Sequence, residues 1–261
     1  MKTQIVATGI LILLGLAGCA SQSGTDTQPP KQSGFVSEGS AQAPPADTVP
    51  NLPLTSYTEA QIAQVLEGMR GDLGSVASGE LLAQKVKIAA KSATEFKASP
   101  EACRPFLVLP ATRAGEALQA GLTAGVLSFG TDVPGQSSML VTVDATGGSS
   151  QRFEEMLAAV QTCSTVRFSY NGRESNGTVQ RLEPSAGSLL TLDVDWKTPG
   201  AQTTPQKGVW MFAHSGSVLI AAGTVLTSTT MNDVEDARTI EAAGKLKGKV
   251  IDTLKGFSEL P

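Results

Sequence analysis

The sequence is poor in the residue types on which most metal and catalytic sites depend. Its 261 residues include one histidine and three cysteines, and aromatic residues make up only 5% of the chain. A single histidine excludes any site that needs two imidazoles, and three cysteines leave little for a structural zinc site. Basic residues are outnumbered as well, since 20 Lys and Arg against 24 Asp and Glu give a net charge of −4. We therefore expect no nucleic-acid partner, because such a chain has no basic excess to neutralise phosphates.

The first 18 residues are typical of an export signal rather than of a folded segment. Lys2 precedes an uncharged stretch, residues 5–17, that is rich in Ile, Leu and Val. As a helix it would rise about 20 Å, which is too short to span a bilayer but fits the apolar region of a signal peptide. The stretch ends in Leu16-Ala17-Gly18-Cys19, which resembles the bacterial lipobox. We predict a lipoprotein signal peptide over residues 1–18 and lipid attachment at Cys19, the alternative being an ordinary signal peptide with a chance cysteine.

The segment that follows Cys19 has the composition of a tether. Residues 20–53 are rich in Ser, Gln, Thr, Gly and Pro, and Phe35 is one of their few large apolar residues. Such a segment buries too little apolar surface to offset the entropy of ordering. We predict a lipidated Cys19 and a disordered tether over residues 19–53, with a coil-like reach of about 30 Å, and a globular domain over residues 54–261. The alternative is a structured amino-terminal subdomain.

Export also predicts the state of the other two cysteines. Two thiols left in an oxidising compartment usually pair, so we expect a disulfide between Cys103 and Cys163. It would close a loop of about 60 residues, for which the chain-entropy model gives a stabilisation of about 4 kcal/mol. The spacing is not Cys-x-x-Cys, so a redox-catalytic role is not expected. Two free buried thiols are the alternative.

The hydrophobic periodicity predicts an α/β (α+β) domain. Alternating apolar residues, with hairpin turns at Asn171-Gly172 and at residues 214–217, indicate the following strands: 122–130, 139–145, 165–170, 178–182, 189–196, 208–213 and 218–223. Three- and four-residue spacing indicates the following helical segments: 58–70, 79–98 (with a strand as the alternative), 100–107, a helix capped by Ser149-Ser150 that leads to Cys163, and 233–255 with Asn232 as its cap. The sum is a single domain, a twisted, mainly antiparallel sheet of roughly five to seven strands with helices packed on it.

The polar residues of this domain form no recognisable catalytic pattern. His214 stands beside Ser215 and Ser217, but neighbours in a tight turn point in different directions, so we expect a solvent-facing turn residue. Asp193 and Asp195 share one face of a predicted strand, and we expect a solvated sheet face rather than a calcium or acid–base site. We therefore expect no catalytic residue, no metal site, no cofactor and no enzymatic activity.

Four large aromatic residues of the predicted sheet leave two interpretations open: Tyr170, Trp196, Trp210 and Phe212. They either fill the core, or line an apolar cleft if one face of the sheet is uncovered. In the second case they are the candidate ligand site.

The order of elements and the placement of the cysteines resemble the PknH-like extracellular sensor domain family, which occurs on mycobacterial receptor kinases and on free-standing actinobacterial lipoproteins. The resemblance covers residues 55–257 and is carried by four segments: Ser99–Cys103, Phe153–Cys163, Val209–Ala213 and Val218–Ile220. It implies an α/β sandwich with a largely antiparallel sheet and a broad cleft for an unidentified ligand. The family commonly has a second disulfide, for which no cysteines remain here.

Together these observations predict a non-enzymatic, lipid-anchored sensor or ligand-binding domain on the extracytoplasmic face of the cell membrane. Its partners would be the membrane, through the lipid anchor, and an unidentified envelope ligand or protein. The alternatives are a lipid or glycolipid carrier, which needs an apolar cavity, and an envelope hydrolase.

Overall fold

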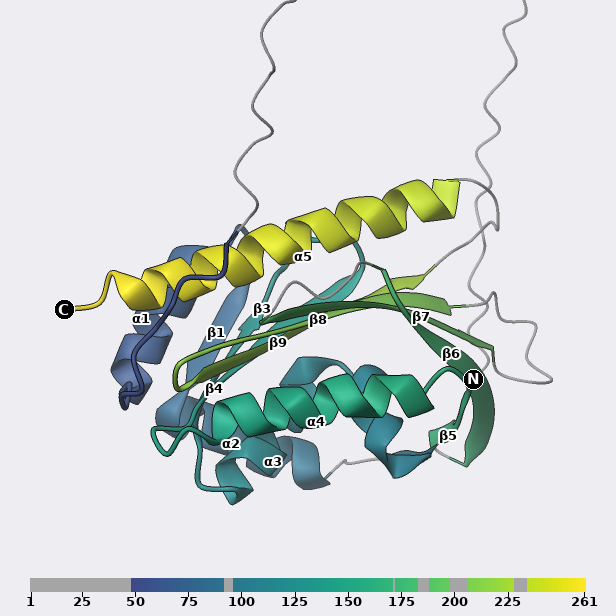
Figure 1. Cartoon of the computed structure of the whole chain (residues 1–261), viewed down its shortest axis with the longest axis horizontal. Coiled ribbons are helices and arrows are strands. Elements are labelled where there is room, and N and C mark those ends of the chain that lie inside the picture. The colour runs from purple at the N-terminus through teal and green to yellow at the C-terminus, as the bar shows by residue number, and fades with distance from the viewer. Residues whose placement is uncertain (1–47, 92–95, 171, 183–187, 198–205, 228–233) are drawn as a thin grey trace, which may run out of the picture. The chain divides into compact units, whose positions relative to one another are not determined.

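The computed structural model describes residues 48–91, 96–170, 172–182, 188–197, 206–227 and 234–261 (Figure 1). The predicted signal peptide, Cys19, nearly all of the predicted tether and the expected cap Asn232 lie outside the described residues. Within the described part of the chain, no helix combines the length and the apolar composition needed to cross a bilayer.

A nine-stranded sheet, all of whose neighbouring strands are antiparallel, runs through the described residues in the order β1-β3-β4-β9-β8-β7-β6-β5-β2. Its strands are β1 Ser75–Ser78, β2 Phe96–Ser99, β3 Thr123–Ser128, β4 Gln136–Val143, β5 Val166–Tyr170, β6 Arg173–Arg181, β7 Leu189–Lys197, β8 Gln206–Ser215 and β9 Val218–Thr227. The predicted fold class is confirmed, but the expected strand number was too low. The sequence pattern did not predict β1, β2 or the first half of β6, which are short or polar and so lack a clear alternation.

Two-residue turns close the two hairpins that the sequence predicted. Tyr170 pairs with Arg173, so β5 and β6 are joined by a two-residue connection, of which Gly172 is described and Asn171 lies outside the described residues. Ser215 pairs with Val218, so the second turn is only Gly216-Ser217. The predicted turn over residues 214–217 was therefore too long, and both His214 and Ser215 belong to β8.

The helical segments in the described residues are α1 Glu59–Met69, α2 Gly79–Lys91, η1 Glu101–Phe106, η2 Pro110–Arg113, α3 Ala114–Gln119, α4 Gly148–Thr162 and α5 Val234–Ser258. The predicted helix over 79–98 is correct as far as Lys91, but Phe96 already belongs to the edge strand β2. The predicted cap of α4 was wrong: the cap residue is Gly147, in a left-handed conformation with φ of 87°. Ser149 lies inside the helix, where its hydroxyl donates to the carbonyl of Ser217 at 2.7 Å.

Helices cover both faces of the sheet and create separate packed clusters (Figure 1). On one face, α1 and α5 bury side chains of the central strands β4, β8 and β9, such as Val141, Met211 and Ile220. On the other face, α4 and η1 pack against β7, β8 and β9 around Trp210 and Phe212. A third, smaller cluster lies beneath α2 and α3 on β1, β3 and β4.

The segment before α1 is fixed to the β8–β9 hairpin. The Leu52 side chain is buried, and its backbone N–H donates to Oγ of Ser215 at 2.8 Å. Gly216 has a φ of 53°, and a side chain there would lie within 2.4 Å of the backbone oxygens of Leu52 and Pro53. The folded domain therefore starts before the predicted boundary at residue 54.

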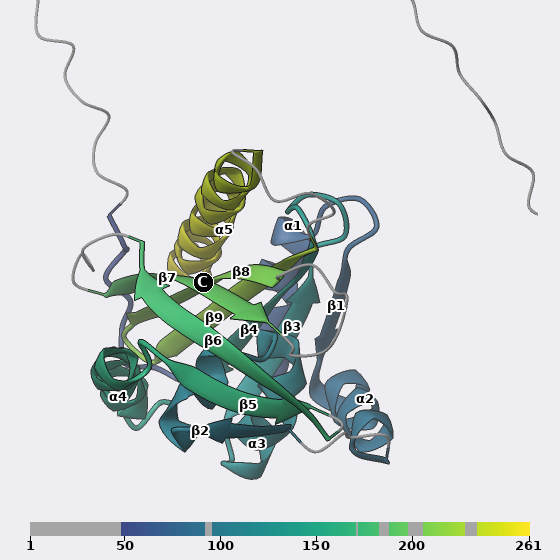
Figure 2. The ribbon, with the colours of Figure 1, turned by 90° about the vertical axis from the view of Figure 1, so that its right-hand side faces the viewer.

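Part of the sheet has a polar face that none of the described helices covers. Figure 2 shows β7, β6, β5 and β2 with no helix in front of them. The strand register places Lys97, Arg167, Glu174, Asn176 and Gln180 on this face, and all five are exposed. The face is thus a solvated surface of mixed charge.

Candidate functional site

Two of the four aromatic residues predicted to fill the core or line a cleft are completely buried. Trp210 and Phe212 lie beneath η1, where the Phe106 and Phe212 rings meet edge to face with centroids 5.6 Å apart. The indole Nε1 of Trp210 donates to the carbonyl of Val108 at 3.1 Å. The core interpretation is therefore correct for these two, and they are not an accessible ligand surface. The side chains of Tyr170 and Trp196 lie outside the described residues.

Two glycines explain why Trp210 is accommodated inside the sheet. A Cβ atom on Gly208 would lie 1.8 Å from the indole ring, and one on Gly223 would lie 3.0 Å from its nitrogen. Gly208 lies two residues before Trp210 on β8, and Gly223 is the cross-strand partner of Trp210 on β9, so the ring lies over backbone where these two positions would otherwise present side chains. The Trp210 ring therefore occupies the space over these two glycines instead of lining an open cleft.

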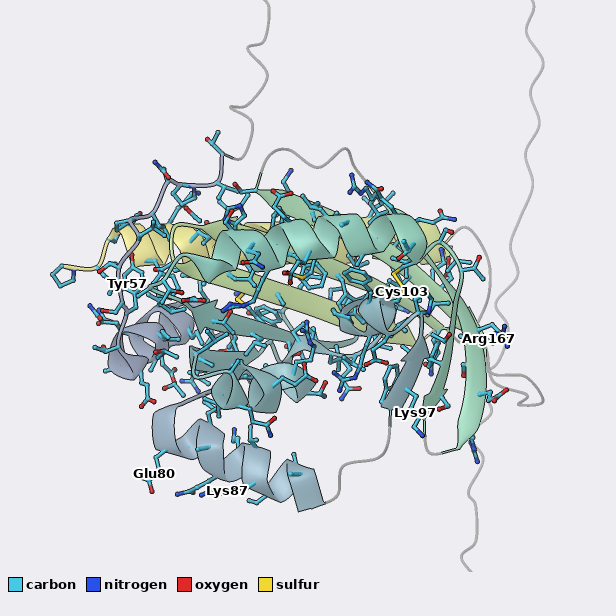
Figure 3. All side chains as sticks on the ribbon, turned by 60° about the horizontal axis from the view of Figure 1, so that its bottom comes forward. Tyr57, Glu80, Lys87, Lys97, Cys103 and Arg167 are labelled. Atoms are coloured by element: carbon cyan, nitrogen blue, oxygen red, sulfur yellow. A yellow bond between two sulfur atoms is a disulfide. The ribbon has the colours of Figure 1, made fainter. Side chains whose placement is uncertain are left out.

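The disulfide between Cys103 and Cys163 is present, as predicted, with a Cα–Cα distance of 5.6 Å. It joins η1 to the end of α4, and both cysteines are fully buried (Figure 3). The bond therefore fixes the two helical segments that cover Trp210 and Phe212. Its surroundings are those of a structural crosslink, because neither sulfur is accessible to an attacking thiolate.

The position predicted for His214 was wrong. The side chain lies half-buried beneath α4, with its ring centroid 4.8 Å from that of Phe153, rather than in a solvent-facing turn. Burial lowers its pKa, while the nearby Glu154 carboxylate acts in the opposite direction. Its Nδ1 is buried and has no hydrogen-bond partner among the described residues. Oγ of Ser215 instead holds the backbone of Leu52, so these neighbours do not act on one another.

The two aspartates of β7 lie on the polar face, as predicted. Asp193 and Asp195 alternate with the fully buried Leu192 and Val194. The Asp195 carboxylate is half-exposed and lies 3.9 Å from the Lys207 ammonium group of β8. Asp195 therefore belongs to the solvated side of the strand, whereas Asp193 is half-buried and its Oδ1 is shielded from solvent.

A hollow lies where α1 meets the second half of α5. It has a volume of about 820 Å³ and is open to solvent. Its walls come from the end of α1, the loop between β3 and β4, and one side of α5. The lining residues are Gly68, Met69, Thr131, Asp132, Lys245, Gly248, Lys249, Asp252, Lys255, Gly256 and Glu259. We name this hollow the α1–α5 groove.

Lys249 holds the three walls of the α1–α5 groove together. Its Nζ donates to the carbonyl of Met69 at 2.9 Å and to Oδ2 of Asp132 at 3.2 Å. The Met69 carbonyl belongs to the last turn of α1, where unpaired carbonyls and the helix dipole favour a cation. One ammonium group thus connects α5 to the end of α1 and to the β3–β4 loop.

Glycine residues of α5 leave space along the α1–α5 groove because they have no side chain. A Cβ atom added to Gly248 would meet no atom within 4 Å, so the packing of the domain does not require glycine there. Gly256 differs, because its Cβ would lie 3.0 Å from the Val65 side chain where α1 and α5 approach. A glycine inside a helix costs roughly 0.5–1 kcal/mol relative to alanine. Gly248 therefore lowers the stability of α5 and leaves open space in return.

Mixed charges line the edges of the α1–α5 groove. Lys255 lies 3.4 Å from the Asp252 carboxylate, and both side chains are 56% exposed. Lys245 pairs with Glu241 at 2.8 Å and lowers the pKa of that carboxyl group. Exposed ion pairs are weak, so water or a ligand competes with them readily. The surface can hold a polar molecule that offers both donors and acceptors.

The sequence alone did not predict this groove. The available signal was a pair of glycines, Gly244 and Gly248, inside the helix predicted over residues 233–255. Helix-interior glycines cost stability, and a spacing of four residues places these two on one side of the helix. That pattern alone does not say whether another helix or open space lies beside them.

The comparisons with known proteins give only structural likenesses. No protein-family model matches the sequence, and no curated protein sequence matches it. The extracellular domain of PknH from Mycobacterium tuberculosis is similar at 12% identity and a TM-score of 0.43, over 76% of this chain and 92% of that chain. An uncharacterized protein from Mycobacterium smegmatis is similar at 13% identity and a TM-score of 0.34, over 77% of this chain and 99% of that chain. So few identical residues transfer no ligand or residue role, and membership of the PknH-like family stays a prediction.

Proposed function

We propose that this protein is a lipid-anchored, non-enzymatic domain on the extracytoplasmic face of the cell membrane, where it binds a polar component of the envelope in the α1–α5 groove. The groove is the observation that carries the binding role. It is open, extends over residues 245–259 of α5 and is lined by both ammonium and carboxylate groups. Such a surface suits an extended polar ligand, such as a cell-wall peptide or glycan, better than it suits a lipid chain, which needs an apolar enclosure.

Two further observations support the extracytoplasmic location. Leu16-Ala17-Gly18-Cys19 follows a short apolar stretch, as in a lipoprotein signal. The buried Cys103–Cys163 disulfide is typical of proteins that fold in an oxidising compartment. The proposed anchor at Cys19 accounts for both, because lipid attachment and disulfide formation each follow export.

Detergent phase separation tests the anchor. The wild-type protein, expressed in a bacterium that processes lipoproteins, is expected in the Triton X-114 detergent phase, whereas Cys19→Ala is expected in the aqueous phase. Each buried acyl CH₂ group contributes about 0.8 kcal/mol to membrane binding, so loss of the acyl chains changes the distribution completely. Equal partition of the two proteins into water would show that Cys19 is not lipidated.

Thermal shift with soluble cell-wall fragments tests the groove. A bound ligand raises the melting temperature of wild type, because it binds the folded state alone. Gly248→Trp should fold, since the added side chain meets no atom near Cβ, but it should fill the groove and abolish the shift. Gly244→Trp is the matched control, because it is equally open, lies one turn earlier on α5 and does not line the groove. If the ligand still raises the melting temperature of Gly248→Trp, it binds at a site other than the α1–α5 groove.

Two chemical assays separate this proposal from the alternatives. Mass spectrometry of organic extracts from the purified protein should show no stoichiometric lipid, whereas a retained lipid would favour a carrier. Turnover assays with ester, peptide and glycoside substrates should stay blank, whereas a rate above background would favour a hydrolase.

A further inference from the structure

Helix α2 packs on the domain through one side only. Leu82 is buried and Val86 lies half-buried, close enough that a side chain on Gly115 of α3 would meet it at 3.1 Å. On the opposite side, Leu81 and Ile88 are 50% and 69% exposed. They are seven residues apart, so they lie in line on the outward face of the helix. α2 therefore carries a second apolar stripe that none of the described elements covers.

Lysines flank this outward stripe on both sides. Lys85 lies next to Leu81 and Ile88 on one flank, at four- and three-residue spacing, and Lys87 lies on the other flank. Both lysines are exposed, and among the described residues neither is in an ion pair. Figure 3 shows Lys87 on α2 at the edge of the domain. The chain as a whole is acidic, with a net charge of −4, so this helix is locally opposite in sign to the molecule.

We propose that α2 is a membrane-contact helix that docks the domain on an anionic bilayer surface. Leu81 and Ile88 enter the boundary between headgroups and acyl chains, and Lys85 and Lys87 bind lipid phosphates. An outward apolar stripe between lysines is the pattern of a helix that lies in the plane of a membrane interface. A negatively charged leaflet attracts each such lysine, so the charge of α2 is complementary to this partner.

The length of chain between Cys19 and the folded domain favours a membrane as the occupant, and on this point the inference rests on the proposed lipid anchor. The described residues begin at residue 48, so 28 residues separate them from Cys19, and the tether predicted for this segment would have a reach of about 30 Å. Two apolar side chains are far fewer than a stable protein interface uses. They suffice for a tethered domain, because the tether keeps the bilayer at a high effective concentration.

Vesicle flotation of the unlipidated chain tests the proposal without the anchor. The protein used is the chain from residue 19 onward with Cys19→Ala. We expect it to float with vesicles of three parts phosphatidylcholine to one part phosphatidylglycerol, and not with phosphatidylcholine alone. Salt at about 0.5 M should release it, because screening removes the attraction between exposed charges.

Paired substitutions on exposed positions separate α2 from the rest of the surface. Leu81→Ser with Ile88→Ser should lower the vesicle partition coefficient more than about tenfold. Ile240→Ser is the matched control and should leave it unchanged, because Ile240 is 71% exposed on α5. Lys85→Gln with Lys87→Gln should lower it about tenfold or more, since each lysine contributes about fivefold. Its control, Lys97→Gln with Arg167→Gln, removes two exposed cations from the uncovered sheet face.

The outcomes separate this proposal from the anchor and from other occupants. No flotation of the parent chain, or equal flotation of the α2 variants and their controls, would overturn the membrane contact. A dimer in sedimentation that Leu81→Ser with Ile88→Ser dissociates, without vesicle binding, would make a second copy the occupant and would also overturn it. Phase separation of the lipidated protein reports on Cys19 alone, so a failure of the anchor is distinguishable from a failure of α2.

Discussion

Single glycines control what the neighbouring side chains can do in this domain. Gly208 and Gly223 leave the space in which Trp210 lies, and that ring then fills the core rather than a cleft. Gly248 leaves space that no side chain fills, and there the α1–α5 groove opens. Glycine thus has two different effects in this domain. Beside Trp210 it makes room for a ring that fills the core, and in α5 it leaves the space of the α1–α5 groove.

Gly248→Ala should raise the free energy of unfolding by roughly 0.5–1 kcal/mol, because alanine has the higher helix propensity and the added methyl group meets no atom. Gly256→Ala is the comparison, since its methyl group would lie 3.0 Å from Val65 and should cancel the gain. Urea denaturation of both variants measures the difference. An equal gain in both would mean that α1 and α5 do not approach as closely as described.

His214 should make stability depend on pH. Burial lowers its pKa below the usual 6.5, so as the pH falls the unfolded chain takes up the proton before the folded one. The stability is therefore full above about pH 7 and falls as the pH drops through 6.5 towards the folded pKa. His214→Phe keeps a ring beside Phe153 and should lose less stability between about pH 7.5 and pH 5.5, measured by urea denaturation. Equal losses in the variant and wild type would place the imidazole in solvent.

At the scale of elements, two contacts between distant segments organise the helices. Lys249 fixes α5 to the end of α1 and to the β3–β4 loop through hydrogen bonds to Met69 and Asp132. The Cys103–Cys163 disulfide fixes η1 to the end of α4 on the opposite face of the sheet. The first contact forms the groove, and the second holds the layer over the buried aromatic residues.

Lys249→Met should lower the free energy of unfolding by about 1–2 kcal/mol, because it removes charged hydrogen bonds from a carbonyl and a carboxylate at a half-buried position. Lys255→Met is the matched control on the same helix, since its pair with Asp252 is largely exposed and should be worth less than about 1 kcal/mol. Urea denaturation measures both. A similar small loss in the two variants would mean that Lys249 does not hold the groove walls together.

Replacing both cysteines of the disulfide, Cys103→Ser with Cys163→Ser, should lower the free energy of unfolding by about 4 kcal/mol. The bond closes a loop with a sequence separation of 60 residues, and the chain-entropy model gives that figure for such a loop. Denaturation of the double variant is compared with that of the oxidised wild type. The reduced wild-type protein should resemble the variant, and no difference between oxidised and reduced protein would contradict the role given to the bond.

At the scale of the whole molecule, attachment, bilayer contact and ligand binding would be performed by different surfaces of the protein. The lipid at Cys19 would provide attachment, α2 would set contact with the bilayer surface, and the α1–α5 groove would bind the envelope component. The groove and α2 share no lining residue, so substitutions in one should not alter the other.

Intact-mass measurement of the exported protein should show signal-peptide removal, lipidation and disulfide formation on the same polypeptide. We expect a polypeptide that begins at Cys19, carries acyl groups and is lighter by two hydrogen atoms than its reduced form, because Cys103 and Cys163 are joined. The same chain made without residues 1–18 in the cytoplasm is the control and should carry no lipid. An unprocessed chain that starts at Met1 would contradict export itself.

The sequence by itself determined the fold class, both hairpins, the core of most elements and the Cys103–Cys163 pairing. These depend on local apolar spacing, on turn residues such as Asn171-Gly172, and on the number of cysteines available. Short or polar strands such as β2 were missed, because four residues at the edge of a sheet carry too weak a pattern to distinguish them from a loop.

Only the tertiary structure decided which side chains are accessible. Trp210 is buried and His214 is half-buried because α4 and η1 cover their face of the sheet, and neither residue's neighbours in the sequence indicate that cover. Gly248 and Ile88 are exposed for the opposite reason, since no described element packs against them. Apolar spacing reports which residues share a side of a helix or strand, whereas exposure depends on segments that are distant in the sequence.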